Sequence, residues 1–571
     1  MAQAPDRQTL YADISRHAQE RPAAMAVIEG PRSITYAQFA KDIDQVSRRL
    51  NGLNLSRDKV VAISVVPVYM HWLVLIGLWR IGVASVSIDG KIAALQLKFF
   101  KPDLVLADQE LGVPFGGPCI RVEADWLVEN DTLFPPFADP QLGPEQTIRL
   151  TASSGTLGLP KRTAYTKRVM DERLDRVRRN PRFNTSICFM SLVGVMAVEF
   201  FFSVGAWSVG GSVEFFSQPV QDALDKGELK ATFLFMNTNQ LRDLVSALPP
   251  ERSPDRSLTV LVGGSVVPKE VYGKALQRLA GSVMIVYGST EAGVVAINPN
   301  PLNYSERGVV GFVVPDMEAQ VINDAGHPVG AGVVGEIRLR STSCVSAYED
   351  DPVATDAAFK GGWFYPGDLG KLSENGLLTV MGRVDEVMNV GGWKVTPAVI
   401  EEVLLGCGGI RDIAACAVRD INGLDQLWVG VVKDEGFSQD ALLALWQRSE
   451  GPTGRALSII YVDAIPRNAM GKILRAELSE LVTKHRGQAL AASPLPSLAE
   501  LRDAGATLRL NGTDIPVDKL SASAFACVAS LQLVDAEMHR MTQQMADYEK
   551  AKAAHSMSLN NMLLEGSILR T

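Results

Sequence analysis

Cysteine and histidine are scarce in this chain, with six of each among 571 residues. No two cysteines form a CxxC pair, and no spacing of cysteine and histidine matches a zinc site. A disulfide scaffold or a zinc-binding domain is therefore not indicated. This sparse use of cysteine is typical of a reducing compartment. The first 22 residues also carry charges where a signal peptide has an apolar core, so we expect a cytoplasmic location.

The chain also lacks an excess of positive charge. It has 56 Lys and Arg and 64 Asp and Glu, which gives a formal net charge of −8. Binding to nucleic acid needs clustered Lys and Arg, so we expect no nucleic-acid partner. Long apolar runs are missing as well. The two most apolar segments, residues 60–88 and 187–211, are interrupted by Pro67, Arg80 and Glu199. A membrane-spanning helix needs about 20 predominantly apolar residues, so we expect buried core and no membrane insertion.

What the sequence does contain is enough apolar material for a large folded protein. Hydrophobic residues make up 47% of the chain and charged residues 21%, which excludes a disordered chain. Up to about residue 340, β-branched runs alternate with helical stretches, which predicts an α/β fold with doubly wound sheets. The expected strands are 60–65, 104–107, 232–235, 260–262 and 284–286, and the expected helices include 36–50 and 269–279. Between about 326 and 384, short strands with glycine turns predict a small β subdomain.

The first chemical motif is a hydroxyl- and glycine-rich loop at residues 151–161, TASSGTLGLPK. Its glycines let the backbone approach a ligand closely, and its N–H groups and hydroxyls can form an anion-binding nest that a lysine closes. Taken alone, such a stretch is equally typical of a mobile surface loop. The candidate phosphate ligands are Ser153, Ser154, Gly155, Thr156, Gly158 and Lys161.

This loop resembles the phosphate loop of the adenylate-forming superfamily, which includes acyl-CoA synthetases, adenylation domains of non-ribosomal peptide synthetases and firefly luciferase. The usual form is close to TSGTTGxPKG; here Leu157 replaces the second Thr and Arg162 the final Gly. Further motifs follow in the family's order. They are GGS at 263–265, VYGSTEAG at 286–293, WFYPGD at 363–368, GRVDEVMNVGGWKV at 382–395 and PRNAMGKILR at 466–475. Each is weak alone, but their order makes coincidence improbable.

The resemblance implies a role for each motif. Tyr287 would stack on a purine, Thr290 would bind a phosphate, and Glu291 would hold Mg²⁺ through oxygen. Asp368 and Arg383 would bind the ribose hydroxyls. The catalytic residues would be Lys472, Thr290 and Glu291, with the Lys472 ammonium placed where negative charge develops. The nucleotide site would also include Gly263, Gly264, Ser265 and Gly288, the hinge would be Asp385, and the loop along the thiol tunnel would hold Gly391, Gly392 and Trp393.

By the same resemblance, the chain would activate a carboxylic acid with ATP and Mg²⁺, release pyrophosphate, and pass the acyl group to a thiol. The thiol would be that of CoA or the phosphopantetheine of an acyl carrier protein. The acyl pocket would be lined near Val193, Met196 and Glu199. This stretch holds neither the Asp of amino-acid-activating domains nor the His of many acyl-CoA synthetases, which disfavours α-amino acids and favours a nonpolar or aryl carboxylate.

The expected domains are a large adenylation domain at 1–384, a small mobile α/β domain at 385–487, a linker at 488–506 and a tail at 507–571. In the tail, alternation around Asn511 and Gly512 predicts a hairpin. Apolar residues then recur at heptad spacing from Leu531 to Tyr548, which is typical of a long, coiled-coil-like helix. Residues 521–565 would mediate self-association or dock a partner, or would pack on the enzyme itself.

A competing hypothesis is a scaffold or binding protein that keeps the fold, has weak or no catalysis, and acts through its helical tail. The departures Leu157, Pro366 and Val399 motivate it. The presence of Lys472 and the other charged site residues favours an active ligase.

Overall fold

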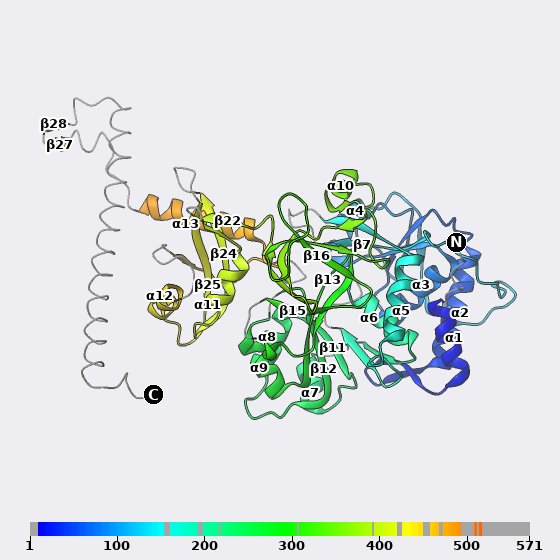
Figure 1. Ribbon diagram of the computed structural model, residues 1–571. Helices are drawn as coiled ribbons and strands as arrows, with labels where there is room; N and C mark the ends of the chain where they lie inside the picture. The colour runs from blue at the N-terminus through cyan, green and yellow to red at the C-terminus, as the bar shows by residue number, and fades with distance from the viewer. Residues whose placement is uncertain are drawn as a thin grey trace. The chain divides into compact units, whose positions relative to one another are not determined.

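The computed structural model describes residues 9–153, 160–191, 198–215, 219–265, 267–304, 308–390, 393–419, 425–448, 457–467, 472–492, 507–510 and 513–516. The chain divides into two compact units, Met1–Ser479 and Glu480–Thr571. The first unit holds the sheets and helices labelled in Figure 1 from α1 to α12, and all the motifs named above fall within it.

The first sheet has six strands in the order β6–β5–β3–β4–β7–β8. Their bounds are β3 (Val60–Ser64), β4 (Ala84–Ser87), β5 (Leu104–Ala107), β6 (Cys119–Arg121), β7 (Thr147–Ser153) and β8 (Lys161–Thr166). All neighbours pair in parallel except β7 and β8, which are antiparallel. Strands joined in parallel need crossover connections, which here include α3 (Val68–Ile81) and α4 (Ala93–Phe100).

The second sheet has a parallel centre in the order β13–β12–β11–β9–β10–β1, with β2 antiparallel at the edge. Its strands are β1 (Met25–Glu29), β2 (Arg32–Thr35), β9 (Cys188–Ser191), β10 (Ser212–Phe215), β11 (Phe233–Asn237), β12 (Asp255–Gly263) and β13 (Ala280–Ser289). Helices α7 (Val220–Lys226), α8 (Thr238–Ala247) and α9 (Lys269–Arg278) share a core with this sheet. A capping box formed by Asn237 and Gln240 fixes the start of α8.

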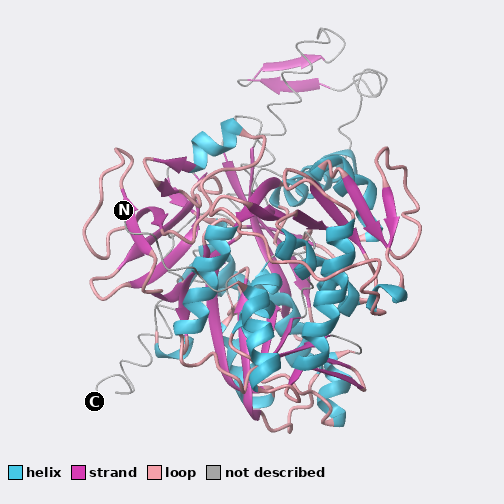
Figure 2. Cartoon of the chain, turned by 90° about the vertical axis from the view of Figure 1, so that its right-hand side faces the viewer, coloured by secondary structure: helices cyan, strands magenta, loops and turns pink. Residues whose placement is uncertain are grey.

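The two apolar segments noted in the sequence contribute strands β3, β4 and β9 to these sheets, and their helices α3 and α6 share one core with strands of both sheets. Helix α3 and helix α6 (Val198–Ser208) are predominantly apolar, and most of their described residues are buried, as expected of helices inside a core. Trp72 of α3 stacks on Phe200 of α6 at 5.8 Å between ring centroids and meets Trp207 edge-on at 5.0 Å. Among the described residues, no helix is long and apolar enough to cross a bilayer. Figure 2 shows helices packed among the strands in this way.

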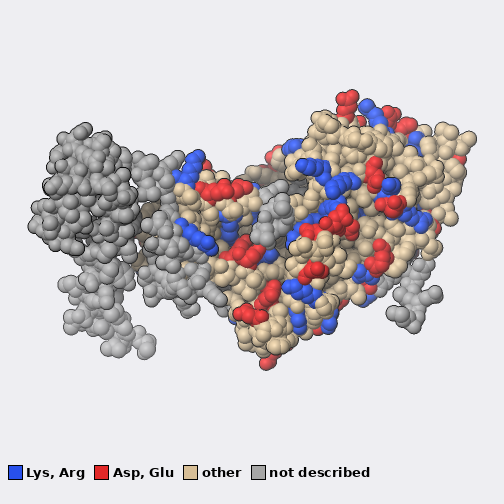
Figure 3. Space-filling view, turned by 90° about the horizontal axis from the view of Figure 1, so that it is seen from above, with Lys and Arg blue, Asp and Glu red and all other residues tan. Residues whose placement is uncertain are grey.

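The remaining helices of this region complete the layers. Helix α1 (Leu10–Glu20), α2 (Tyr36–Gly52) and α5 (Lys167–Arg179) contribute to the same core as α3 and α6. Thr35 and Thr166 cap the starts of α2 and α5 through their side chains. On the face shown in Figure 3, acidic and basic side chains of the described residues are interspersed.

The β subdomain continues the second sheet beyond β13 through antiparallel pairs. It comprises β14 (Gly293–Asn298), β15 (Val309–Val313), β16 (Glu318–Ile322), β17 (Gly335–Arg340), β18 (Phe359–Lys360), β19 (Trp363–Phe364), β20 (Asp368–Leu372), β21 (Leu377–Arg383) and the helix α10 (Pro352–Ala358). The predicted switch to short strands and glycine turns is therefore confirmed.

After Arg383 a small α/β region follows, which we call the small lobe (residues 385–479). It contains β22 (Met388–Val390), β23 (Trp393–Val395), α11 (Pro397–Leu404), β24 (Ile410–Arg419), β25 (Asp425–Lys433), α12 (Gln439–Arg448), β26 (Ser458–Tyr461) and the start of α13 (Arg475–Ala492). Strands β24, β25 and β26 form its sheet, and α11 and α12 share a core with it. The α/β fold class predicted from the sequence is thus confirmed.

The tail is described only in part. Helix α13 includes residues 488–492, which we had predicted to begin a linker. Strands β27 (Thr507–Leu510) and β28 (Thr513–Pro516) pair antiparallel, as the hairpin prediction requires. The predicted heptad helix at 521–565 lies outside the described residues.

Candidate active site

The site begins where parallel strands of the second sheet end. Asn237 of β11 pairs with Gly263 of β12, and Gly263 pairs with Val286 of β13, so the GGS and YGSTE motifs emerge at one edge of the sheet. The next glycine, Gly264, has a φ of +94°, which favours glycine. Thr238 donates a hydrogen bond to the Ser265 carbonyl at 3.2 Å. This edge is where α/β sheets bind ligands.

The backbone of the YGSTE motif makes a tight turn between β13 and β14. A Cβ atom on Gly288 would lie 2.2 Å from the Gly293 carbonyl oxygen, so a side chain cannot be accommodated there without a shift. The buried Arg173 donates to the carbonyls of Thr290 and Glu291 at 3.1 and 3.0 Å. These contacts fix the backbone that carries two of the predicted catalytic residues.

The phosphate loop connects β7 and β8, whose ends Ser153 and Lys161 are directly opposite. The loop residues themselves, including Ser154, Gly155, Thr156 and Gly158, lie outside the described residues. At the base of the loop, the Lys161 Nζ lies 4.8 Å from the centre of the Tyr348 ring, a cation–π contact. The same tyrosine reaches the YGSTE motif.

Tyr348 was not singled out by any sequence motif. Its phenol donates a hydrogen bond to Oε1 of Glu291 at 2.8 Å, and Glu291 is only 5% exposed. Burial, and then the negative charge of Glu291, raise the pKa of Tyr348 well above its usual value. The phenol therefore keeps its proton and remains a donor to this carboxylate.

Asp368 and Arg383, the two residues predicted to bind ribose, pair across β20 and β21. The Arg383 guanidinium lies 3.1 Å from Asp368 Oδ1, and Tyr287 donates to Oδ2 at 2.5 Å. Arg383 also donates to the carbonyl of Pro366, a backbone acceptor that does not depend on which side chain stands at that position. Burial raises the pKa of Asp368, and Arg383 and Tyr287 oppose this effect.

Lys472 belongs to the same electrostatic environment. Burial, followed by repulsion from Arg383, lowers the pKa of its ammonium. Its positive charge in turn favours the ionised form of Asp368. The residue predicted to be the catalytic lysine is thus within electrostatic reach of the two residues predicted to hold the ribose.

Arg475, the last residue of the motif PRNAMGKILR, joins several parts of the small lobe. Its position in the motif is a sequence signal by which this residue could have been found. Arg475 donates to Glu386 at 3.0 Å, to Glu401 at 3.2 Å and to the carbonyl of Ala415 at 2.8 Å. Glu401 follows the departure Val399, whose side chain packs against the apolar core of the small lobe. Replacement of the usual Glu by Val399 therefore leaves the contacts of Arg475 with Glu401 in place.

Several predicted site residues cannot be placed. Val193, Met196, Gly391 and Gly392 lie outside the described residues. Glu199 falls on α6 and Trp393 begins β23, and only their backbones are described. Asp385, the predicted hinge, is exposed, and its Oδ1 lies 3.4 Å from Nε of Arg383.

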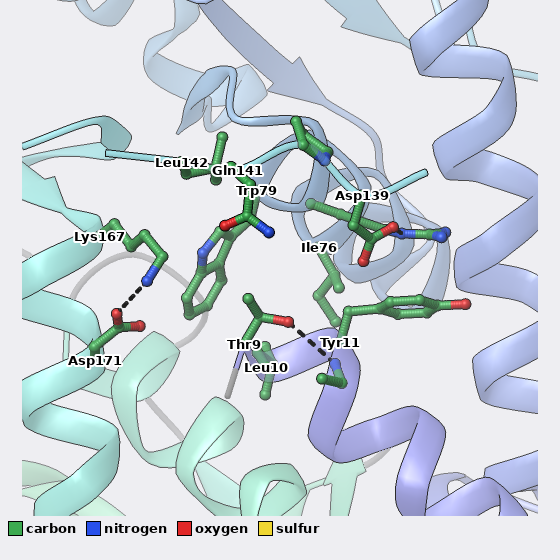
Figure 4. A pocket seen from close by; sticks show the side chains of 13 residues that line it. Thr9, Leu10, Tyr11, Ile76, Trp79, Asp139, Gln141, Leu142, Lys167 and Asp171 are labelled. Carbon is green, nitrogen blue, oxygen red and sulfur yellow. Dashed lines mark hydrogen bonds and ion pairs between the residues drawn. The ribbon is translucent and has the colours of Figure 1, made fainter. Parts of the chain in front are cut away.

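A cavity of about 350 Å³ elsewhere in the first unit contains none of the motif residues. It lies between α1, α3 and the chain at 139–142, as Figure 4 shows. Lys167 pairs with Asp171 at 2.6 Å and Arg80 with Asp139 at 2.7 Å on its walls. The charges of these four residues are therefore paired, and the predicted site residues lie elsewhere.

Comparison with known proteins assigns the family. The family model described as AMP-binding enzyme matches residues 14–349, more than half of the chain. The chain belongs to the AMP-binding enzyme family. The adenylate-forming family predicted from the motifs is therefore confirmed, as is the prediction of an AMP-forming acid–thiol ligase.

Related AMP-binding enzymes cover most of the chain. The indoleacetate–CoA ligase of Aromatoleum aromaticum is 28% identical over 514 residues, or 82% of this chain and 98% of that protein. The 4-chlorobenzoate–CoA ligase of an Arthrobacter species is 25% identical over 506 residues, or 84% and 96%. ATP-bound MatB from Rhodopseudomonas palustris has the same fold, with a TM-score of 0.72 at 20% identity, covering 83% of this chain and 99% of that one.

The carboxylate of Glu291 is the predicted ligand for Mg²⁺. Among the described residues, no group of three or more His, Cys, Asp or Glu is placed to hold a metal ion. Glu291 contributes one carboxylate. In the contacts described above, Tyr348 donates to Oε1 of this carboxylate and not to Oε2. Mg²⁺ is commonly held by one or two carboxylates together with the phosphates of a substrate, and a single carboxylate beside a phosphate loop fits that manner of binding.

Proposed function

We propose that the chain joins a nonpolar or aromatic carboxylic acid to coenzyme A in two steps, through an acyl-adenylate. The observation that carries the residue assignment is the continuous set of contacts from Tyr287 through Asp368 to Arg383, with the charge of Lys472 acting on it. These four residues come from four separate motifs. Their meeting supports one nucleotide site, because each has the chemistry that its predicted role requires.

In the first step, the acid carboxylate attacks the α-phosphate of ATP and pyrophosphate leaves. Two anions must approach each other, so the chain's task is positioning and charge neutralisation. Asp368 and Arg383 bind the ribose, the phosphate-loop residues with Lys161 and Thr290 hold the phosphates, and Lys472 stabilises the charge that develops at the α-phosphate. Glu291 would hold Mg²⁺ together with the phosphates, and the ion would neutralise part of their charge.

In the second step a thiol attacks the adenylate and AMP leaves. We propose that the small lobe turns about Asp385 between the two steps, so that the loop at Gly391, Gly392 and Trp393 replaces Lys472 at the site. With the hinge at Asp385, we propose a large domain at 1–384 and a small mobile domain at 385–487. Coenzyme A is the favoured thiol because the relatives above are CoA ligases by name. Transfer to a carrier protein is the alternative.

The substrate class rests on two observations. The segment predicted to line the acyl pocket is apolar apart from Glu199. Relatives in the family are named for indoleacetate, 4-chlorobenzoate and long-chain fatty acids. The apolar segment favours a carboxylate with an aromatic or aliphatic body and no second charge, although another relative is named for 2-succinylbenzoate. The reaction is expected in the cytoplasm.

The test is ATP–pyrophosphate exchange with matched panels of aryl acetates, benzoates, fatty acids, dicarboxylates and α-amino acids. We expect exchange with one of the first three panels and little with the last two. Coenzyme A and a phosphopantetheinylated carrier protein are then added separately to the best acid. A protein that folds and binds ATP but exchanges pyrophosphate with no acid would favour the scaffold hypothesis.

For the tail, we propose that residues 521–565 mediate self-association or dock a partner. The separate compact unit at Glu480–Thr571 supports this. Truncation after Ala492 is expected to lower the mass measured by light scattering while leaving pyrophosphate exchange intact. An unchanged mass would exclude self-association through the tail.

A further inference from the structure

One carboxylate of the small lobe joins two arginines that are far apart in the sequence. Asp412, on β24, is only 9% exposed. Arg467 donates to both of its oxygens, at 2.9 Å to Oδ1 and 3.2 Å to Oδ2. Arg242 of α8 reaches Oδ1 from the other direction at 3.3 Å. Two guanidinium groups thus share one largely buried carboxylate.

Arg467 lies next to the segment that carries Lys472. Arg467 forms an antiparallel bridge with Ile473, and the N–H of Leu474 donates to the carbonyl of Pro466 at 2.8 Å. Lys472 lies just inside this bridge. A bidentate arginine–carboxylate pair is geometrically specific, so Asp412 sets the orientation of the chain immediately before the lysine segment.

The second arginine belongs to the other side of the predicted hinge. Arg242 lies on α8, which packs on the second sheet of the large domain, whereas Asp412 and Arg467 lie beyond Asp385. The contacts therefore run from α8 through Asp412 and Arg467 to the Lys472 segment. In this arrangement the charge of Lys472 acts on Asp368 of the nucleotide site, as the adenylation step requires. The ion pair between Arg242 and Asp412 therefore joins the large domain to the small lobe in the adenylation pose.

We infer that Arg242 is a positioning residue for the adenylation half-reaction, holding Lys472 at the nucleotide site through Asp412 and Arg467. The inference rests on the proposed function and on rotation about Asp385. Because α8 stays with the large domain when the small lobe turns, the contact between Arg242 and Asp412 breaks in the second pose. Arg242 therefore acts on the first half-reaction and not on the second.

The experiment measures the two half-reactions separately in Arg242→Glu and Arg242→Lys. The first is pyrophosphate exchange, and the second is thioester formation from a synthetic acyl-adenylate and coenzyme A. We expect Arg242→Glu, which repels Asp412, to slow exchange about tenfold or more, and Arg242→Lys to retain at least a third of the rate. Thioester formation should be unchanged in both variants.

The matched control is Lys274→Ala, which removes a positive charge from the adjacent helix α9, where Lys274 pairs with Glu270 of the same helix at 2.7 Å. It should change neither half-reaction. The inference is overturned if Arg242→Glu exchanges at the wild-type rate, or if both half-reactions fall equally. Wild-type exchange and Lys472→Ala test the proposed function itself, so a silent Arg242→Glu in an enzyme that depends on Lys472 would reject this inference alone.

Discussion

Tyr348 donates its phenolic hydrogen to Glu291 across 2.8 Å, although 57 residues separate them in the sequence. The same ring lies against the Lys161 ammonium at 4.8 Å. One side chain therefore connects the base of the phosphate loop to the carboxylate that we assign to Mg²⁺. Tyr348 thereby contacts both of the charged groups, Lys161 and Glu291, that we propose to bind the phosphates and their Mg²⁺.

Tyr348→Phe tests this connection. The ring and its contact with Lys161 remain, but the buried Glu291 carboxylate loses a donor, at a cost of about 1.5–3 kcal/mol for a hydrogen bond to a charged group. We expect a roughly tenfold or greater fall in pyrophosphate exchange and a higher Mg²⁺ concentration for half-maximal rate. Tyr461→Phe, an exposed tyrosine of the small lobe, is the control and should match the wild type. Equal Mg²⁺ dependence in Tyr348→Phe would remove the proposed link to the metal.

Lys472→Ala should abolish most of the adenylation rate. In the proposed mechanism the ammonium stabilises charge at the α-phosphate, and loss of one such group typically costs about 10²–10³-fold. Thioester formation from synthetic acyl-adenylate should survive, because the lysine serves only the first step. Circular dichroism and thermal melting should be unaltered, since the side chain is half-buried and not in a core. Retention of full exchange would refute the assignment of the lysine.

Two glycine variants should have opposite effects on stability. Gly288→Ala places a Cβ atom 2.2 Å from a backbone oxygen of Gly293, and such overpacking costs about 1–3 kcal/mol. Gly273, within α9, has nothing within 4 Å of its added Cβ, so Gly273→Ala should stabilise by up to about 1 kcal/mol through helix propensity. Chemical denaturation measures both. A neutral Gly288→Ala would show that the turn carrying Thr290 adapts readily.

His71 makes stability depend on pH. Its Nδ1 lies 3.2 Å from the Val65 carbonyl, so Nδ1 carries the proton and Nε2 accepts from Ser87 at 2.7 Å. Burial, and then the nearby Arg149, lower the pKa of His71 to about 4. A depressed pKa contributes stability that is present above the unfolded value of 6.5 and is lost as the pH falls through 4.

The expected loss of unfolding free energy attributable to His71 is about 3 kcal/mol between pH 6.5 and pH 4. Denaturation of wild type and His71→Gln at several pH values isolates it, since other titrating groups are common to both proteins. The difference between the two proteins should shrink as the pH falls. Parallel pH profiles would contradict the lowered pKa of His71.

The sequence predicted the elements that depend on local pattern and the residues that lie in motifs. Strand β5 begins and ends where its apolar run does, and Asp368 and Arg383 come from separate motifs that meet. Residues without a motif could not be found in this way. Tyr348 and Arg173 act on the site only because tertiary packing brings them to Glu291, and no spacing along the chain encodes that proximity.

The two apolar segments show that burial can be predicted from the sequence, whereas packing partners cannot. Residues 60–88 and 187–211 indicated burial, but not that α3 and α6 would meet through Trp72 and Phe200. A predominantly apolar helix has little periodicity that points to a partner. Layer order is therefore decided by packing, and the sequence leaves it open.

Arg475 has a mechanical consequence for the small lobe. It joins Glu386, the residue next to Asp385, to Glu401 and to the backbone of β24, and it stands three positions after Lys472. If the lobe turns about Asp385 as proposed, Glu386, Glu401 and the start of α13 are expected to move together, because this guanidinium joins them. The small lobe is therefore expected to rotate as one body and to carry Lys472 with it.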